Sequence, residues 1–169
     1  YQRSKIMLSP GVIILDIETT GFNPKKDSII EIHAVRYWRG KIQEEFSTLI
    51  KPNSGIPAPV TRLTGLKESD FEEAPTYNEI KEDLYRFLKS KRIIAYNSSF
   101  DKRFLVSNDR RISCLRFIDY LKFMKRKRPN LKSYRLGEVA KYFGFRFKEQ
   151  HRARGDVEIL IRLIKTFGY

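Results

Sequence analysis

Apolar runs and residues with high β-propensity in the first fifty positions are typical of β-strands. Residues 12–15 (Val-Ile-Ile-Leu) form a continuous apolar run, as in a buried central strand. Residues 29–38 are rich in β-branched and aromatic residues, and Arg39-Gly40 predicts a turn into a partner strand over residues 42–50. Together, these three segments predict a sheet that begins with antiparallel neighbours.

From residue 76 onward, the apolar spacing changes to that of an amphipathic helix. Thr76 is placed to cap this helix, whose apolar stripe ends at Leu88. Residues 92–96 then predict a second buried strand, and Phe100 lies near the start of the next helix. Strand and helix therefore alternate in the middle of the chain.

The last third of the chain is predicted to be helical. Apolar stripes cover residues 136–143 and 157–164, and Gly144 is placed to end the first of these helices. Strands followed by alternating strands and helices predict an α/β fold, with a mixed sheet and helices packed on its faces. The length of 169 residues, without a repeat or a linker, indicates one domain. We expect an N-terminal extension over residues 1–10 and the domain over residues 11–169.

The chain carries a large excess of positive charge. Thirty-four Lys and Arg residues against 20 Asp and Glu residues give a net charge of +14, which predicts a polyanionic partner, nucleic acid ahead of an acidic membrane surface. The single cysteine, Cys114, excludes a disulfide scaffold, so we expect a reducing, cytoplasmic location. No apolar stretch is long enough to span a bilayer, and no membrane partner is expected. The first residue is Tyr1 rather than Met, as in a piece of a longer chain.

Two acidic residues follow the first apolar run. Asp16 and Glu18 are two positions apart, so both side chains lie on one face of a strand. Two carboxylates held this close repel each other unless a cation lies between them, and Mg²⁺ binds through one or two carboxylates plus substrate phosphates. The alternative is a solvated Asp-x-Glu pair without a function.

Three further ionisable residues lie at the starts of predicted helices. Asp101 lies where residues 92–96 meet the next helix, and Asp156 lies near the first turn of the last helix. An acid in the first turn is stabilised by the helix dipole and needs no function. His151 precedes the last helix, where a lone histidine is often structural.

The order of these residues resembles the DEDDh, or DnaQ-like, 3′–5′ exonucleases, a family that includes the epsilon proofreading subunit of bacterial DNA polymerase III. The resemblance covers the chain from about Val12 to Ile164. Its three motifs are Asp16-Ile17-Glu18-Thr19-Thr20-Gly21, Asn97-Ser98-Ser99-Phe100-Asp101 and His151-Arg152-Ala153-Arg154-Gly155-Asp156.

The resemblance implies a fold, a reaction and a set of catalytic residues. It implies a ribonuclease H-like α/β fold, with a mixed five-stranded sheet and helices on both faces. Asp16, Glu18, Asp101 and Asp156 would hold two divalent ions, Mg²⁺ or Mn²⁺, which stabilise both oxygens of an in-line displacement. His151 would take a proton from the attacking water, and the product would be a nucleoside 5′-monophosphate.

The resemblance also implies where the terminal nucleotide of the substrate binds. Phe22 and Phe100 offer surfaces on which an unpaired base can stack; the alternative for both is a place in the core. The predicted substrate-binding residues are Thr19, Gly21, Phe22, Leu63, Asn97 and Phe100.

Three positions depart from the family pattern. Members often have a histidine at the position of Thr64, which puts one contact to the terminal nucleotide in doubt. They usually have histidine at the position of Tyr96 and a small residue at the position of His33. We interpret His33 as structural, because it lies in an apolar strand.

The preferred hypothesis is a metal-dependent exonuclease that acts on single-stranded or frayed 3′ ends of DNA, with proofreading for a DNA polymerase subunit as one role. The first alternative is a 3′–5′ exoribonuclease, because the same catalytic residues serve both. The second is an inactive domain that binds nucleic acid or a polymerase. A basic run at Lys122, Lys125, Arg126, Lys127 and Arg128 is either a phosphate-binding patch or a solvated helix end.

Overall fold

The protein, described here by a computed structural model that covers residues 11–89, 91–147 and 151–169, is built on one mixed sheet. The sheet has five strands in the order β3-β2-β1-β4-β5, which confirms the expected number of strands. The strands are β1 (Val12–Thr19), β2 (Ile29–Trp38), β3 (Lys41–Leu49), β4 (Arg92–Ala95) and β5 (Phe117–Asp119).

The first three strands are antiparallel and the last two run parallel to β1. Arg39 and Gly40 join β2 to β3 with φ values of 48° and 79°, the left-handed conformation that a tight hairpin turn requires. The register pairs Asp16 with His33 and Glu18 with Glu31 across β1 and β2. Strands β4 and β5 extend the sheet on the other side of β1 in parallel, and helices connect them, as a parallel crossover demands.

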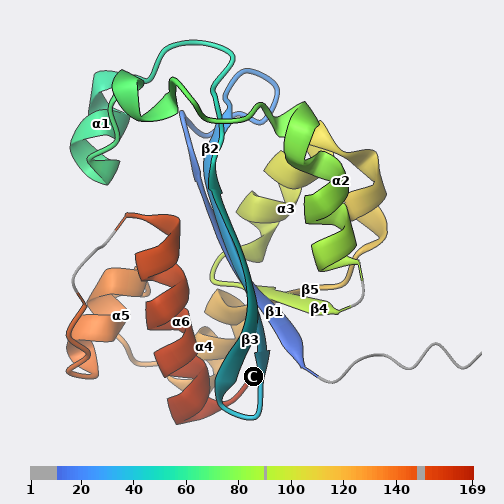
Figure 1. The fold of residues 1–169 in the computed structure, drawn as a ribbon. Helices are drawn as coiled ribbons and strands as arrows, with labels where there is room; N and C mark the ends of the chain where they lie inside the picture. The colour runs from blue at the N-terminus through green and yellow to red at the C-terminus, as the bar shows by residue number, and fades with distance from the viewer. Residues whose placement is uncertain (1–10, 90, 148–150) are drawn as a thin grey trace, which may run out of the picture.

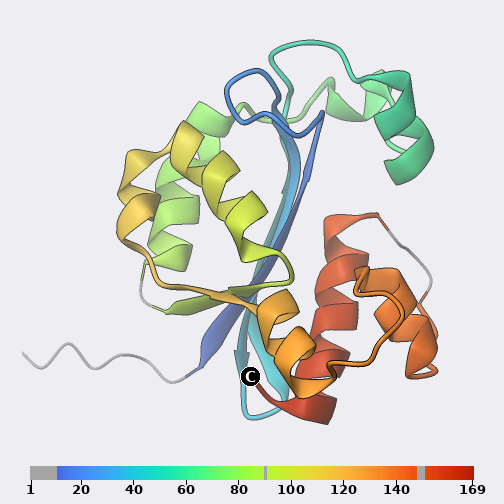
Figure 2. The ribbon, with the colours of Figure 1, turned by 180° about the vertical axis from the view of Figure 1, so that it is seen from behind.

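Helices cover both faces of the sheet (Figures 1 and 2). Helices α2 and α3 pack on one face, and α4, α5 and α6 pack on the other. The helices are α1 (Ala58–Thr64), α2 (Tyr77–Leu88), α3 (Ser98–Asn108), α4 (Tyr120–Lys127), α5 (Leu136–Tyr142) and α6 (Ala153–Phe167). Two short 3₁₀ helices, Glu68–Phe71 and Arg110–Cys114, complete the fold.

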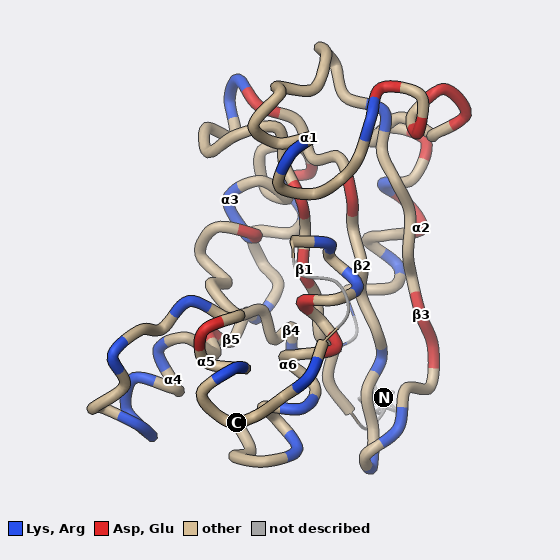
Figure 3. Tube along the Cα trace, turned by 90° about the vertical axis from the view of Figure 1, so that its left-hand side faces the viewer, with Lys and Arg blue, Asp and Glu red and all other residues tan. Residues whose placement is uncertain are grey.

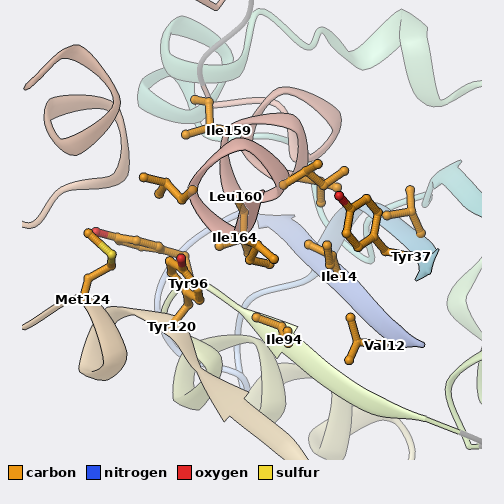
Figure 4. Packing of buried hydrophobic residues seen from close by; sticks show 14 of the residues in the cluster. Val12, Ile14, Tyr37, Ile94, Tyr96, Tyr120, Met124, Ile159, Leu160 and Ile164 are labelled. Carbon is orange, nitrogen blue, oxygen red and sulfur yellow. The ribbon is translucent and has the colours of Figure 1, made fainter. Parts of the chain in front are cut away.

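The alternation along β1 determines which face each of its side chains occupies. Val12 and Ile14 belong to the core under α6, whereas Ile13 and Leu15 belong to the core under α2 and α3. Figure 4 shows the first of these cores, in which Val12 and Ile14 of β1 and Leu160 and Ile164 of α6 are labelled. Because side chains alternate along a strand, Asp16 and Glu18 continue the row of Val12 and Ile14 and face α6.

Most of the predicted elements are confirmed. The structure also confirms Thr76 as the N-terminal cap of α2, where its side chain and that of Glu79 form a reciprocal capping box. The pattern did not locate β5, which has only three residues of intermediate burial. The expected extension at residues 1–10 lies outside the described residues, among which no helix is long and apolar enough to cross a membrane.

Candidate active site

Three carboxylates meet where the C-terminal half of β1 passes the N-terminus of α6. Asp16, Glu18 and Asp156 each offer an oxygen atom, and these three atoms lie within 4.8 Å of one another. Asp156 belongs to the first turn of α6, which packs directly on β1. All three side chains are partly exposed, so the group is accessible to an ion or a substrate.

Asp101 comes from a third element, the first turn of α3, and is buried with 4% exposure. A backbone hydrogen bond from Ile17, the residue between Asp16 and Glu18, ties its carboxylate to β1. Asp101 does not belong to the three-carboxylate group defined above. Its charge nevertheless raises the pKa of Asp16, which places it at the edge of the same cluster.

Burial raises the pKa of every member of the cluster, and repulsion by other members adds to it at Asp16 and Glu18. Burial raises the pKa of Asp16 well above its usual value, and Asp101 and Asp156 add to this effect. Burial, with repulsion from Asp156, raises the pKa of Glu18 to about 8, and burial raises the pKa of Asp101 to about 7. Burial also raises the pKa of Asp156 to about 6, against a hydrogen bond from the His151 backbone. Ionised carboxylates in this arrangement therefore need a positive partner.

The donor set fits a hard divalent cation. Carboxylate oxygens are the ligands that Mg²⁺ and Mn²⁺ prefer. One oxygen of Asp156, Oδ1, is buried and has no hydrogen-bond partner among the described residues. A buried carboxylate oxygen without a donor is costly, and a cation would satisfy it.

His151 precedes the first turn of α6 and adopts a left-handed backbone conformation, with φ of 63°. Its side chain is partly exposed, and burial lowers its pKa. The imidazole is therefore neutral at pH 7 and able to accept a proton. Because Asp156 accepts the His151 backbone hydrogen bond, the histidine is next to the carboxylates.

Glu31 on β2 holds the N-terminal end of α6. This role was not predicted from the sequence. Glu31 is 6% exposed and accepts hydrogen bonds from the Arg152 side chain (Nη2 to Oε1, 2.8 Å) and from the Ala153 backbone N–H (3.1 Å). It is also the cross-strand neighbour of Glu18. An acidic residue inside the apolar run of residues 29–35 was the available signal, because a buried charge requires a partner.

The loop after β1 carries three of the predicted substrate-binding residues. Thr19 donates a hydrogen bond from Oγ1 to the Gly21 carbonyl at 2.6 Å. A Cβ atom on Gly21 would lie 2.5 Å from a carboxylate oxygen of Asp27, so any larger residue would force the Asp27 side chain to move. Phe22 is 86% exposed, and its ring meets that of Phe100 edge-on, with centroids 6.3 Å apart. This loop therefore exposes most of the Phe22 ring to solvent.

The remaining predicted substrate-binding residues come from α1 and α3. Phe100 is partly buried, and its ring lies 5.0 Å from that of Phe104, so it combines a core contact with the contact to Phe22. Asn97 is exposed at the start of α3. Leu63 on α1 is 53% exposed. Figure 1 shows α1 above the N-terminal end of α6, on the same side of the sheet.

All three departures from the family pattern concern buried side chains, and Tyr96 is 8% exposed. Thr64 is 6% exposed, and its hydroxyl donates to the Val60 carbonyl at 2.9 Å, so its side chain is engaged within the fold. His33 is 3% exposed, and its Nδ1 atom lies 3.7 Å from a Glu45 carboxylate oxygen. Burial lowers the pKa of His33. The structural interpretation of His33 stays a prediction.

Comparison with known proteins agrees with this geometry. The exonuclease family RNase T matches residues 13–164. The DNA polymerase III PolC-type protein of Caldanaerobacter subterraneus is 31% identical over 169 residues, which cover 96% of this chain and 12% of that protein. The DNA polymerase III epsilon subunit of Aquifex aeolicus is 30% identical over 171 residues, which cover 96% of this chain and 85% of that subunit. The chain therefore spans about one eighth of the PolC-type relative and most of the epsilon subunit.

Two solved structures share the fold. Exonuclease X in complex with 5′ overhanging duplex DNA has a TM-score of 0.71 and 24% identity, over 94% of this chain and 93% of that one. Exonuclease I of E. coli in complex with a dT13 oligonucleotide has a TM-score of 0.82 and 20% identity, over 94% of this chain and 42% of that one. Together with the match over residues 13–164, these likenesses confirm the predicted resemblance: the chain belongs to the RNase T family of exonucleases, related to the DnaQ-like epsilon subunit of DNA polymerase III.

Proposed function

We propose that this exonuclease domain removes nucleotides one at a time from the 3′ end of DNA, releasing nucleoside 5′-monophosphates. The observation that carries the proposal is the approach of Asp16, Glu18 and Asp156 to within 4.8 Å, at a place open to solvent. Exonucleases of this family depend on divalent metal ions. We assign the domain to residues 11–169, with residues 1–10 as an extension, and the match over residues 13–164 supports this assignment.

We assign the metal-binding role to four carboxylates. Asp16, Glu18 and Asp156 would hold Mg²⁺ or Mn²⁺, and Asp101 would complete a site for two ions. Bound there, the ions would supply charge that stabilises the attacking and leaving oxygens. The carboxylates would fix the positions of the ions, and through them that of the scissile phosphate, since their elements β1, α3 and α6 are rigid parts of the core. The positive charge of the ions would lower the raised pKa values of these carboxylates.

His151 would act as the general base. Its pKa is lowered by burial, so it is neutral at pH 7 and can accept the proton of the attacking water. The carboxylate of Asp156 holds the backbone of this residue, and Glu31 holds the neighbouring Arg152. A small shift of this segment would therefore reduce the rate, because proton transfer requires hydrogen-bond contact.

The residues around the site suit an unpaired 3′ terminus. Phe22, 86% exposed, would stack on a base, and Leu63 on α1, 53% exposed, would contact it from the other side. Thr19, Gly21, Asn97 and Phe100 would lie around the same nucleotide. A base pair would have to open before its 3′ nucleotide enters, so a frayed or mismatched end would be preferred over a paired one.

The experiment that tests this function uses DNA and RNA single strands labelled at the 5′ end, with Mg²⁺, Mn²⁺ or EDTA. We expect a ladder that shortens from the 3′ end of DNA and disappears with EDTA or with Asp16→Ala. Asp83→Ala on α2, whose side chain is 67% exposed, is the matched control and should retain activity. Faster shortening of RNA would instead identify an exoribonuclease. No shortening of either strand would overturn the proposal.

We further propose that the domain proofreads beside a DNA polymerase subunit in the cytoplasm. The curated relatives are DNA polymerase III proteins, which supports this role. Primer–template DNA with a mismatched 3′ end should be hydrolysed faster than the paired form, and Phe22→Ala should weaken this preference. Equal rates on both ends would argue against proofreading.

A further inference from the structure

The positive charge of the chain is concentrated in one segment. Residues 120–147 contain nine basic residues and one acidic residue, an excess of eight, whereas the net charge of the whole chain is +14. The segment comprises α4, the loop that follows it and α5. The basic residues are Lys122, Lys125, Arg126, Lys127, Arg128, Lys132, Arg135, Lys141 and Arg146. We call this set the α4–α5 surface.

The charges of the α4–α5 surface are exposed and largely uncompensated. All nine side chains are exposed. Within the described part of the chain, Lys141 alone among them forms an ion pair, with Glu138 at 3.2 Å. Figure 3 shows the blue positions gathered over α4, whereas red positions lie on β1. A concentration of unpaired cations attracts a polyanion.

Aromatic rings accompany these cations. Tyr142 at the end of α5 is 71% exposed and meets Phe143 edge-on, with centroids 5.0 Å apart. One groove beside Tyr142 is lined by residues 127–131 with Phe143, and a second is lined by residues 130–133 with the ion-paired Glu138 and Lys141. Grooves that combine cations with an exposed ring are typical of proteins that bind single-stranded nucleic acid.

Helix α4 starts near the carboxylate cluster, but its basic residues Lys125, Arg126 and Lys127 lie in its last turn, at the far end of the helix. Asp119 caps α4 by accepting a hydrogen bond from the Lys122 backbone at 2.9 Å, and its charge acts on Asp101. Helix α4 has eight residues, which at about 1.5 Å per residue corresponds to about 12 Å. At about 3.4 Å per stacked nucleotide, that length corresponds to roughly four nucleotides.

We propose that the α4–α5 surface binds the sugar–phosphate backbone of the substrate strand, beginning roughly four nucleotides from its 3′ end. This inference rests on the proposed exonuclease function and specifies how that function holds its substrate. The basic side chains contact phosphates without reading sequence, and Tyr142 stacks on a base. Substrate length therefore determines whether the surface contributes to binding.

The test compares two variants that remove the same charge. The first carries Lys122→Gln, Arg126→Gln and Lys127→Gln on α4. The control carries Lys41→Gln on β3, Lys81→Gln on α2 and Lys89→Gln at the C-terminal cap of α2, away from this surface. We measure binding of a DNA single strand of about 12 nucleotides by fluorescence anisotropy in EDTA, a length within the usual site size for such proteins. Hydrolysis of that strand and of a strand of about three nucleotides, shorter than the estimated span, is measured with Mg²⁺.

We expect the α4 variant to bind the long strand about tenfold more weakly, with a salt slope smaller by about 2 for three lost phosphate contacts. Its hydrolysis of the short strand should equal that of the wild type. The control should match the wild type on both strands. Tyr142→Ala should also weaken long-strand binding by about tenfold.

Other outcomes overturn the inference in distinguishable ways. Equal losses of hydrolysis on the short and the long strand would place the effect of the α4 variant at the catalytic site. Equal losses in both charge variants would indicate general electrostatic attraction rather than this surface. Unchanged long-strand binding in the α4 variant would overturn the inference directly and would point to an acidic protein as the partner of the surface. If the wild type hydrolyses neither strand while the binding difference remains, the proposed function fails and the binding surface stands.

Discussion

The carboxylate cluster at β1 and the α4–α5 surface are both groups of like charges, but they differ in burial. Asp16, Glu18, Asp101 and Asp156 lie at the junction of three core elements, and burial raises the pKa of each. The nine cations of the α4–α5 surface are all exposed, and water and salt screen their mutual repulsion. Bringing like charges together therefore costs much more free energy in the carboxylate cluster than on the α4–α5 surface.

This difference suggests that the carboxylate cluster serves hydrolysis and the α4–α5 surface serves binding. Carboxylates held in a partly desolvated site need a cation and give that cation a fixed position, as hydrolysis requires. Exposed cations form mobile contacts that raise affinity for a polyanion but position no reacting atom. If the two regions act this way, changes in one should affect the rate of hydrolysis, and changes in the other should affect binding.

The largest effect is expected from a substitution inside the cluster. Glu18→Gln removes a charge but keeps the shape, and hydrolysis should fall by about 10³-fold or more, because metal stabilisation of the transition state is worth several kcal/mol. Binding of a long DNA strand in EDTA should not weaken. Single-turnover rates and anisotropy measure the two properties, and Glu73→Gln, an exposed residue, is the control. Retained hydrolysis in Glu18→Gln would refute the assigned role of this carboxylate.

The second effect separates the two regions by salt. Raising the salt concentration from about 50 to 200 mM should weaken binding of a long single strand by about 50-fold if four phosphates are contacted. Hydrolysis of a strand of about three nucleotides should change far less, because it does not reach the α4–α5 surface. Titrations at several salt concentrations measure the slope. A slope near zero would show that exposed cations do not hold the strand.

The third effect concerns Glu31, which holds the segment carrying His151. Glu31→Gln should reduce the hydrolysis rate by about tenfold, as is usual when a group that orients an active-site residue is lost. Substrate binding in EDTA should stay the same. Glu44→Gln, which removes an exposed ion pair with Arg36 on the neighbouring strands, is the matched control. A Glu31→Gln enzyme with the wild-type rate would show that the Arg152 contact serves stability alone.

The smallest effect is a pH-dependent change in stability. The folded pKa of Glu18 is about 8, above its unfolded value of about 4.3. Between these values the unfolded chain binds fewer protons, so this residue lowers stability as pH rises. In EDTA, Glu18→Gln should therefore exceed the wild type in Tm by a few degrees at pH 8 and by less at pH 5. Thermal scans measure this difference. A difference that shrinks with rising pH would contradict the raised pKa, and added Mg²⁺ should favour the wild type.

Local patterns in the sequence were sufficient for most elements. The composition of residues 29–38 predicted β2, and Thr76 marked the start of α2, because hydrophobic periodicity and capping act over a few residues. The spacing of Asp16 and Glu18 also placed both on one face of β1. The fifth strand could not be located, since β5 is short and takes its conformation from pairing with β4.

By itself, the sequence determined the fold class, the family through its three ordered motifs, and the excess of positive charge. The tertiary structure alone decided which charges meet. It brings Asp156 against β1, connects Asp101 to Ile17, pairs Glu31 with Arg152 across 121 positions of the chain, and places the start of α4 near the carboxylates. These contacts depend on the order of strands in the sheet and on the packing of helices over it. Strand order and helix packing cannot be read from residues that are close in sequence, because they depend on how the whole core is buried.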